Sequence, residues 1–126
     1  MILVHATNKK ELEREENFYG RDIVERDGFI RCDELKNYKD YVEITNKENN
    51  ILLLIETFYF DDTPASFDGH IGGVRVEGVI PKNSIEKIVD IKTDKNGRYV
   101  DEEDIEEYLN QLKKWLILVI NLFYMV

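Results

Sequence analysis

Three charged side chains lie on short predicted strands, where a rigid backbone would fix them for chemistry. Arg31 lies in the apolar run 29–32, on the opposite face from its two neighbours. Arg75 and Glu77 lie two residues apart on the run 74–80, and so share one strand face. A guanidinium fixed in this way can grip a diphosphate through two parallel hydrogen bonds. The alternatives are a surface ion pair for Arg31 and an ion pair between Arg75 and Glu77.

The small numbers of cysteines and histidines exclude several kinds of site. With Cys32 as its one cysteine, the chain can form no internal disulfide, and two histidines cannot complete an ordinary zinc site. We predict no metal and a core position for Cys32, which has only Arg31 nearby to lower the pKa of its thiol. The first residues lack the basic region of a signal peptide, so we expect a reducing, cytoplasmic location.

The composition favours one acidic globular domain. Of the 126 residues 43% are hydrophobic, which is enough for a core, and we expect a single domain over residues 1–126. The net charge of −9 would repel phosphate backbones, so non-specific binding of nucleic acid is not expected. A local positive cluster could still bind a small anionic nucleotide. An acidic protein could alternatively bind a basic partner by mimicking nucleic acid.

Short strands and helices alternate along the chain. Asn8, with Glu11 three residues later, predicts the start of a helix that ends at Gly20. Asp33 is expected to cap a second helix, and Gly69 to Gly73 fall in a long flexible loop. Apolar patterning predicts strands at residues 2–5, 29–32, 51–60, 74–80 and 88–91, with turns at 27–28 and 94–97.

The last segment, residues 100–126, predicts one long helix that is amphipathic and then apolar. Six acids occupy its first two turns, where the helix dipole favours negative charge. From Trp115 onward only Asn121 is polar. Twelve residues are too few to span a bilayer, so membrane association is not favoured. The apolar end is expected in the core or in an interface with a second copy or another protein, and shallow membrane contact is the weaker alternative.

Three motifs in order resemble a known bacterial family. His-Ala-Thr ends the first strand at residues 5–7, Gly-Phe-Ile-Arg-Cys-Asp follows at 28–33, and Gly-Val-Ile-Pro lies at 78–81. Over residues 2–92 this order is similar to the family catalogued as domain of unknown function 952. The family's fold is similar to that of ADP-ribosyltransferases, including RNA 2′-phosphotransferases. The resemblance implies an α+β fold with a split or bent sheet and short N-terminal helices; the long C-terminal helix, which lies outside the resemblance, completes the predicted fold.

The resemblance also implies a ligand and roles for particular residues. The ligand would be NAD or an ADP-ribose-like nucleotide, with His5, Thr7, Arg31 and Arg75 in the binding site. His5 would hold the ribose, and Glu77 would stabilise an oxocarbenium-like ribose in catalysis. Arg31 and Asp33 replace a histidine and a serine of the family. We therefore expect a binding protein of weak or no activity; the alternatives are an active ADP-ribosyltransferase-like enzyme and an acidic interaction protein.

Overall fold

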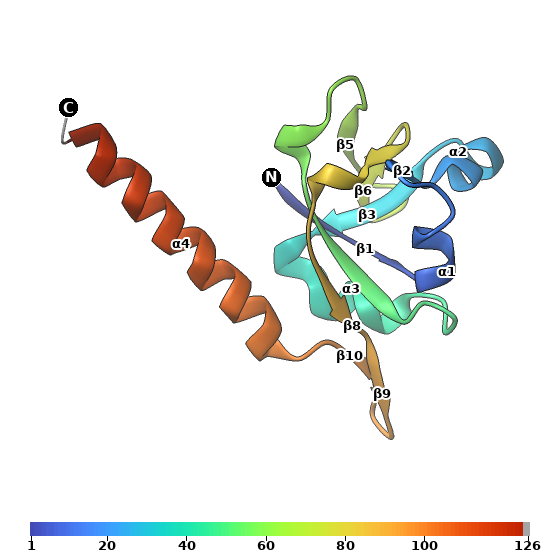
Figure 1. The fold of residues 1–126 in the computed structure, drawn as a ribbon. Coiled ribbons are helices and arrows are strands. Elements are labelled where there is room, and N and C mark those ends of the chain that lie inside the picture. The colour runs from blue at the N-terminus through green and yellow to red at the C-terminus, as the bar shows by residue number, and fades with distance from the viewer. Residues whose placement is uncertain (125–126) are drawn as a thin grey trace.

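The computed structural model describes residues 1–124 as a six-stranded sheet flanked by short helices, with one long helix leaving it (Figure 1). The strand order is β5-β6-β3-β1-β4-β8, and every neighbouring pair is antiparallel. These strands are β1 (Ile2–Thr7), β3 (Ile30–Glu34), β4 (Ile51–Glu56), β5 (Ala65–Asp68), β6 (Gly73–Val76) and β8 (Ile85–Asp90). The predicted α+β class is confirmed.

Smaller elements close the ends of the sheet. Two ribbons pair β2 (Phe18–Tyr19) with β7 (Ile80–Pro81), and β9 (Lys92–Asp94) with β10 (Gly97–Tyr99). The helices are α1 (Lys9–Leu12), α2 (Arg21–Asp27), α3 (Tyr38–Ile44) and α4 (Glu102–Tyr124). Short 3₁₀ turns, η1 (Leu35–Asn37), η2 (Thr57–Tyr59) and η3 (Lys82–Ser84), join strands to their successors.

Apolar side chains of β1 and β4 are buried on both faces of the sheet. Leu3 and Leu53 point into a core that includes Tyr19. Val4 and Leu54 point into a second core, which α3 and the start of α4 cover. Burying each such side chain contributes roughly 1.5–3 kcal/mol, so these two strands form the stable centre of the fold. The apolar run at the start of β4 therefore predicted its place correctly.

The sheet splits where β1 and β3 part. The two strands pair over only two residues each, up to Val4 and Asp33, while residues 30–32 pair with β6 instead. Beyond that point the Ala6 amide donates to the Tyr41 hydroxyl at 2.9 Å, in place of a strand carbonyl. At this end, side chains rather than ladder hydrogen bonds join β1 to β3, while β1 still pairs with β4 and β3 with β6.

The predicted first helix, 8–19, is wrong beyond its first turn. Asn8 does cap α1, accepting from the Glu11 amide at 2.9 Å, but the helix stops at Leu12. Phe18 and Tyr19 instead form β2, which pairs with β7 from far along the chain. A long-range strand pair therefore overrides a helical sequence in which Leu12 is the one apolar residue of the turn.

Other differences arise from pairings that local sequence does not reveal. The predicted loop 61–73 contains β5, which pairs along β6, and the turn 94–97 lies inside the β9–β10 hairpin. The strand predicted at 51–60 ends at Glu56. Asp33 lies within β3 and accepts from the Glu34 amide and the Asn37 side chain, so it stabilises the turn without being the residue that caps α3.

The long C-terminal helix is confirmed, but its apolar end is not in the core of its own chain. Ile105 and Tyr108 of α4 pack into the second core, and Leu112 contacts it. From Trp115 to Tyr124 the helix runs away from the body of the molecule (Figure 1) and its apolar side chains are exposed. Within residues 1–124, no helix combines the length and apolarity that crossing a bilayer requires. Residues 125–126 lie outside the described range.

Candidate functional site: a cleft at the sheet split

A cleft of about 580 Å³ opens at the split between β1 and β3. The ends of β1 and β3 form one part of its wall. The rest comes from α1, β2, α2, the loop after α3 and Ile71 in the turn before β6. The predicted site residues His5, Thr7 and Arg31 all line it. The cleft therefore brings together three of the five residues that the sequence singled out.

His5 joins the two strands across the split. Its Nδ1 donates to the backbone carbonyl of Arg31 at 2.7 Å, and its Nε2 accepts from the Tyr19 hydroxyl at 2.7 Å. The carbonyl can only accept, which fixes the proton on Nδ1. The Tyr41 hydroxyl also donates to the Arg31 carbonyl, at 3.3 Å. Both imidazole nitrogens are thus used within the protein, and His5 positions the cleft wall.

Burial keeps this imidazole neutral. His5 is 7% exposed, and desolvation lowers its pKa to about 4, although its bond to the Arg31 carbonyl partly opposes the shift. Burial also raises the pKa of the Tyr19 and Tyr41 hydroxyls well above the ordinary value. These three side chains are therefore uncharged hydrogen-bonding groups at neutral pH. Thr7, at the end of β1, is buried beside them.

The loop after α3 is held against the cleft from outside. Arg98 of β10 donates to the Thr45 carbonyl at 2.9 Å and also to the carbonyls of Asn46 and Asn49. The Asn50 amide then donates to the Thr7 carbonyl at 2.9 Å, which joins the loop to β1. Several backbone carbonyls of one loop therefore share a single guanidinium, which fixes the cleft residues Asn46 and Asn49.

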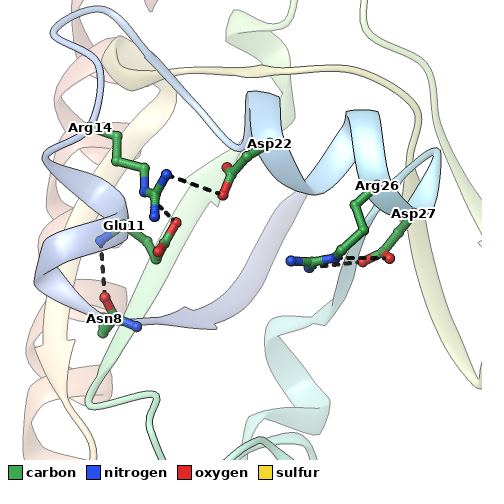
Figure 2. Close-up of polar contacts among 6 residues, drawn as sticks. All are labelled: Asn8, Glu11, Arg14, Asp22, Arg26 and Asp27. Atoms are coloured by element: carbon green, nitrogen blue, oxygen red, sulfur yellow. Dashed lines mark hydrogen bonds and ion pairs between the residues drawn. The ribbon is translucent and has the colours of Figure 1, made fainter.

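Two cleft arginines are neutralised by neighbouring acids, as Figure 2 shows. Arg14 lies 2.9 Å from Glu11 and 3.9 Å from Asp22, so it links α1 to α2. Arg26 forms two parallel hydrogen bonds of 3.1 Å with Asp27, which lower the pKa of that carboxyl. Both arginines line the cleft, but their charges are largely matched.

Arg31 differs from these two arginines. Its Nη2 donates to the Ile71 carbonyl at 2.6 Å. Within residues 1–124, no carboxylate forms an ion pair with it. Its cross-strand neighbour is Arg75, a cation whose charge Asp68 and Glu77 already match. The exposed Arg31 guanidinium therefore retains a full charge for an anionic ligand.

Arg75 and Glu77 lie outside the cleft lining. Arg75 lies 3.0 Å from Glu77 and 3.1 Å from Asp68, and its guanidinium stacks 4.1 Å above the Phe29 ring. The pairing alternative that the sequence left open is thus what the structure contains. Phe29 does line the cleft, so Arg75 supports the wall from behind.

Sequence reasoning missed Tyr19, Tyr41 and the loop 46–49. Tyr19 was placed in the predicted first helix, and Tyr41 fell in the second helix with no signal that singled it out. Both are largely buried, with their hydroxyls at the split. A buried tyrosine hydroxyl needs a hydrogen-bond partner. His5, at the end of the predicted first strand, was the residue that could have suggested such a partner. Cys32 is fully buried, as predicted, and burial raises the pKa of its thiol.

Comparisons with known proteins identify the fold alone. No family model matches the sequence, and no curated protein matches it. Two crystal structures, of protein CC0527 from Caulobacter crescentus and of its double mutant, match with a TM-score of 0.62 and 14% identity. Each match covers 82% of this chain and 96% of the other. The chain is therefore similar in fold to this bacterial protein.

Proposed function

We propose that the protein is a nucleotide-binding module whose ligand is NAD or an ADP-ribose-like molecule, bound in the cleft at the sheet split. The observation that carries this proposal is the exposed Arg31 guanidinium, which has no acidic partner in a cleft where Arg14 and Arg26 are already paired. Charge-assisted hydrogen bonds to phosphate are among the strongest that a protein makes. Arg31 would hold the diphosphate.

The remaining lining suits the rest of such a ligand. The cleft volume of about 580 Å³ is within the range of small-molecule sites. Phe29, Ile23 and Ile71 supply apolar surface for a base or nicotinamide ring, and Asn46 and Asn49 supply amide groups for ribose hydroxyls. His5 would have a positioning role, because its hydrogen bond to the backbone carbonyl of Arg31 holds that part of β3 in place.

Binding without efficient catalysis is the better supported form of this proposal. Glu77, the predicted stabiliser of an oxocarbenium, is paired with Arg75 and is absent from the cleft lining. Glu77 therefore has no part in the proposed binding site. Four acids line the cleft: Glu11, Asp22 and Asp27 are engaged by arginines, and Glu48, in the loop after α3, forms no ion pair within residues 1–124.

Calorimetric titration with ADP-ribose and NAD tests the proposal. Removing a charged hydrogen-bond donor costs roughly 1.5–3 kcal/mol, so Arg31→Ala should weaken ADP-ribose binding about ten- to a hundred-fold. Arg21→Ala is the matched control, because it removes the same charge from an exposed arginine that pairs with Glu15 outside this cleft. It should leave the affinity within about two-fold.

Two results would oppose the proposal in different ways. Absence of saturable binding by the unmodified protein would reject the ligand class. Measurable NAD turnover that Glu77→Gln abolishes would support the enzyme alternative, and would require Glu77 to leave Arg75 when the ligand binds.

A further inference from the structure

The outer end of α4 exposes far more apolar surface than an isolated domain usually shows. Nine large apolar side chains between positions 115 and 124 are each 40–82% exposed. At about 200 Å² for a large residue, they leave on the order of 1,000 Å² uncovered. The largest apolar patch of a typical monomer is about 300–600 Å². The nine residues, called here the apolar end, are Trp115, Leu116, Ile117, Leu118, Val119, Ile120, Leu122, Phe123 and Tyr124.

The apolar end has no polar side. Six consecutive apolar residues, 115–120, point in every direction round a helix of 3.6 residues per turn. A helix that is apolar all round is normally buried on several sides. A partner that covers a single stripe would therefore leave much of it exposed.

A groove beside α4 continues this apolar surface onto the body. It has a volume of about 610 Å³. Its apolar lining comes from Ile2, Phe58 and Tyr59 of the body and from Leu112 and Trp115 of α4, and its polar lining includes Glu56, Glu86, Lys87 and Gln111. Phe58 is 82% exposed at its edge. Tyr108 also lines the groove, and its buried hydroxyl has no hydrogen-bond partner among the described residues. The apolar part of the groove is therefore continuous with the apolar end and can be covered together with it.

We propose that a second copy of this chain covers both surfaces, with the two α4 helices antiparallel and each apolar end lying toward the partner's groove. The groove is a concave wedge between a helix and a sheet, which a helix fills better than a flat lipid surface does. A stable interface needs about 800 Å² from each partner, and the apolar end can supply this from its roughly 1,000 Å² only if the partner's α4 covers one side of it and the partner's groove covers another. A two-fold axis across the apolar ends makes the contact self-complementary.

Charge selects the antiparallel arrangement. The first two turns of α4 and its cap carry six acids, at positions 101–104, 106 and 107. A parallel pair would place these twelve carboxylates side by side, whereas an antiparallel pair places the two acidic ends far apart. Like charges across packed helices destabilise the pairing, so the apolar ends overlap and the acidic ends diverge.

Sedimentation equilibrium of the full chain without detergent tests the proposal. We expect a dimer in which Ile117→Glu with Ile120→Glu weakens association roughly thirty-fold or more, as for the loss of an interface hot spot. Both side chains are exposed, so circular dichroism should show an unchanged fold. Phe58→Ser should also weaken the dimer. Its matched control is Phe67→Ser, at a similarly exposed phenylalanine on β5 that does not line the groove.

A distance measurement tests the direction of the helices. A spin label is attached at Asn110→Cys, because Cys32 is buried and should not react. In an antiparallel pair whose apolar ends overlap, each label lies about ten residues from the centre of the overlap, so the two labels should be about 30 Å apart at a rise of about 1.5 Å per residue. A parallel pair would bring the labels within roughly 15 Å, since packed helices lie about 10 Å apart, and would overturn the arrangement.

Other outcomes would overturn the second copy as the occupant. One is a monomer at every concentration, and another is a dimer that the glutamate variants leave intact. A third is monomeric chain that co-sediments with phosphatidylcholine vesicles, with or without phosphatidylserine, and loses this binding in the same variants. That third result would assign the apolar end to a lipid surface.

Discussion

Two runs of apolar residues in this protein have similar composition and opposite environments. In β4, Leu53 is fully buried between neighbouring strands, whereas Leu118 on the outer end of α4 is 60% exposed. β1 and β8 flank β4 within the same chain. The outer turns of α4 extend past the body, where none of the described chain covers them (Figure 1). Apolar sequence thus specifies that a segment will be covered, while the topology decides whether its own chain does so.

The largest effect expected from this contrast comes from one substitution made at both places. Leu53→Ala should lower the free energy of unfolding by about 2–5 kcal/mol, because it leaves a cavity in a packed core. Leu118→Ala should change it by less than about 0.5 kcal/mol at protein concentrations where the chain is monomeric. Urea unfolding of both variants checks this, and equal losses would contradict the contrast.

The second effect is a dependence of folding stability on pH, which the buried imidazole of His5 should cause. The folded pKa of His5 is about 4, below the unfolded value of 6.5, so the unfolded chain takes up this proton first as the pH falls. Stability should therefore be unaffected by His5 above about pH 6.5. It should decrease between there and pH 4 by roughly 3 kcal/mol in total, and should decrease no further from this group below pH 4.

Urea unfolding across that pH range measures this contribution in the unmodified protein and in His5→Asn. The Asn variant should lose less stability on acidification, because it lacks the titrating ring; His70→Asn, at an exposed turn, controls for the substitution type. Parallel pH profiles for the unmodified protein and His5→Asn would show that the imidazole does not stay neutral when folded.

A smaller effect concerns the hydroxyl that bridges the split. Tyr41→Phe leaves the Ala6 amide without its 2.9 Å acceptor, and an unsatisfied buried donor costs about 1–3 kcal/mol. Tyr99→Phe, at a partly exposed position on β10, should cost less than about 0.5 kcal/mol. Thermal unfolding of both variants compares them. Equal losses would mean that the Tyr41 hydroxyl does not replace a strand partner.

The fold was predictable where a segment carries its own pattern. The continuous apolar run of β4 and the helical spacing of α4 specify strand and helix without help from distant residues. β2 and β5 were not predictable. β2 forms only by pairing with β7, which lies far along the chain, and β5 forms by pairing with β6 across a glycine-rich segment. Gly73 shows the same limit: a Cβ there would lie 2.6 Å from the Cys32 carbonyl, a contact visible only once β3 and β6 are paired.

The candidate site was predictable to a similar extent. The motifs at 5–7 and 28–33 located His5, Thr7 and Arg31, which do converge on the cleft. The spacing of Arg75 and Glu77 was compatible with either a site or an ion pair, and the sequence could not show that Asp68 joins them. The tyrosines at the split escaped notice because their role depends on where two strands part.

Amide chemical shifts of the isotopically labelled full chain, followed during titration with ADP-ribose, test the central claim most directly. The account predicts the largest shifts in residues 5–8, at Arg31 and in the loop 46–49, with little change along the outer half of α4. Shifts confined to the groove around Phe58, or no shifts at saturating ligand, would contradict a nucleotide site at the sheet split.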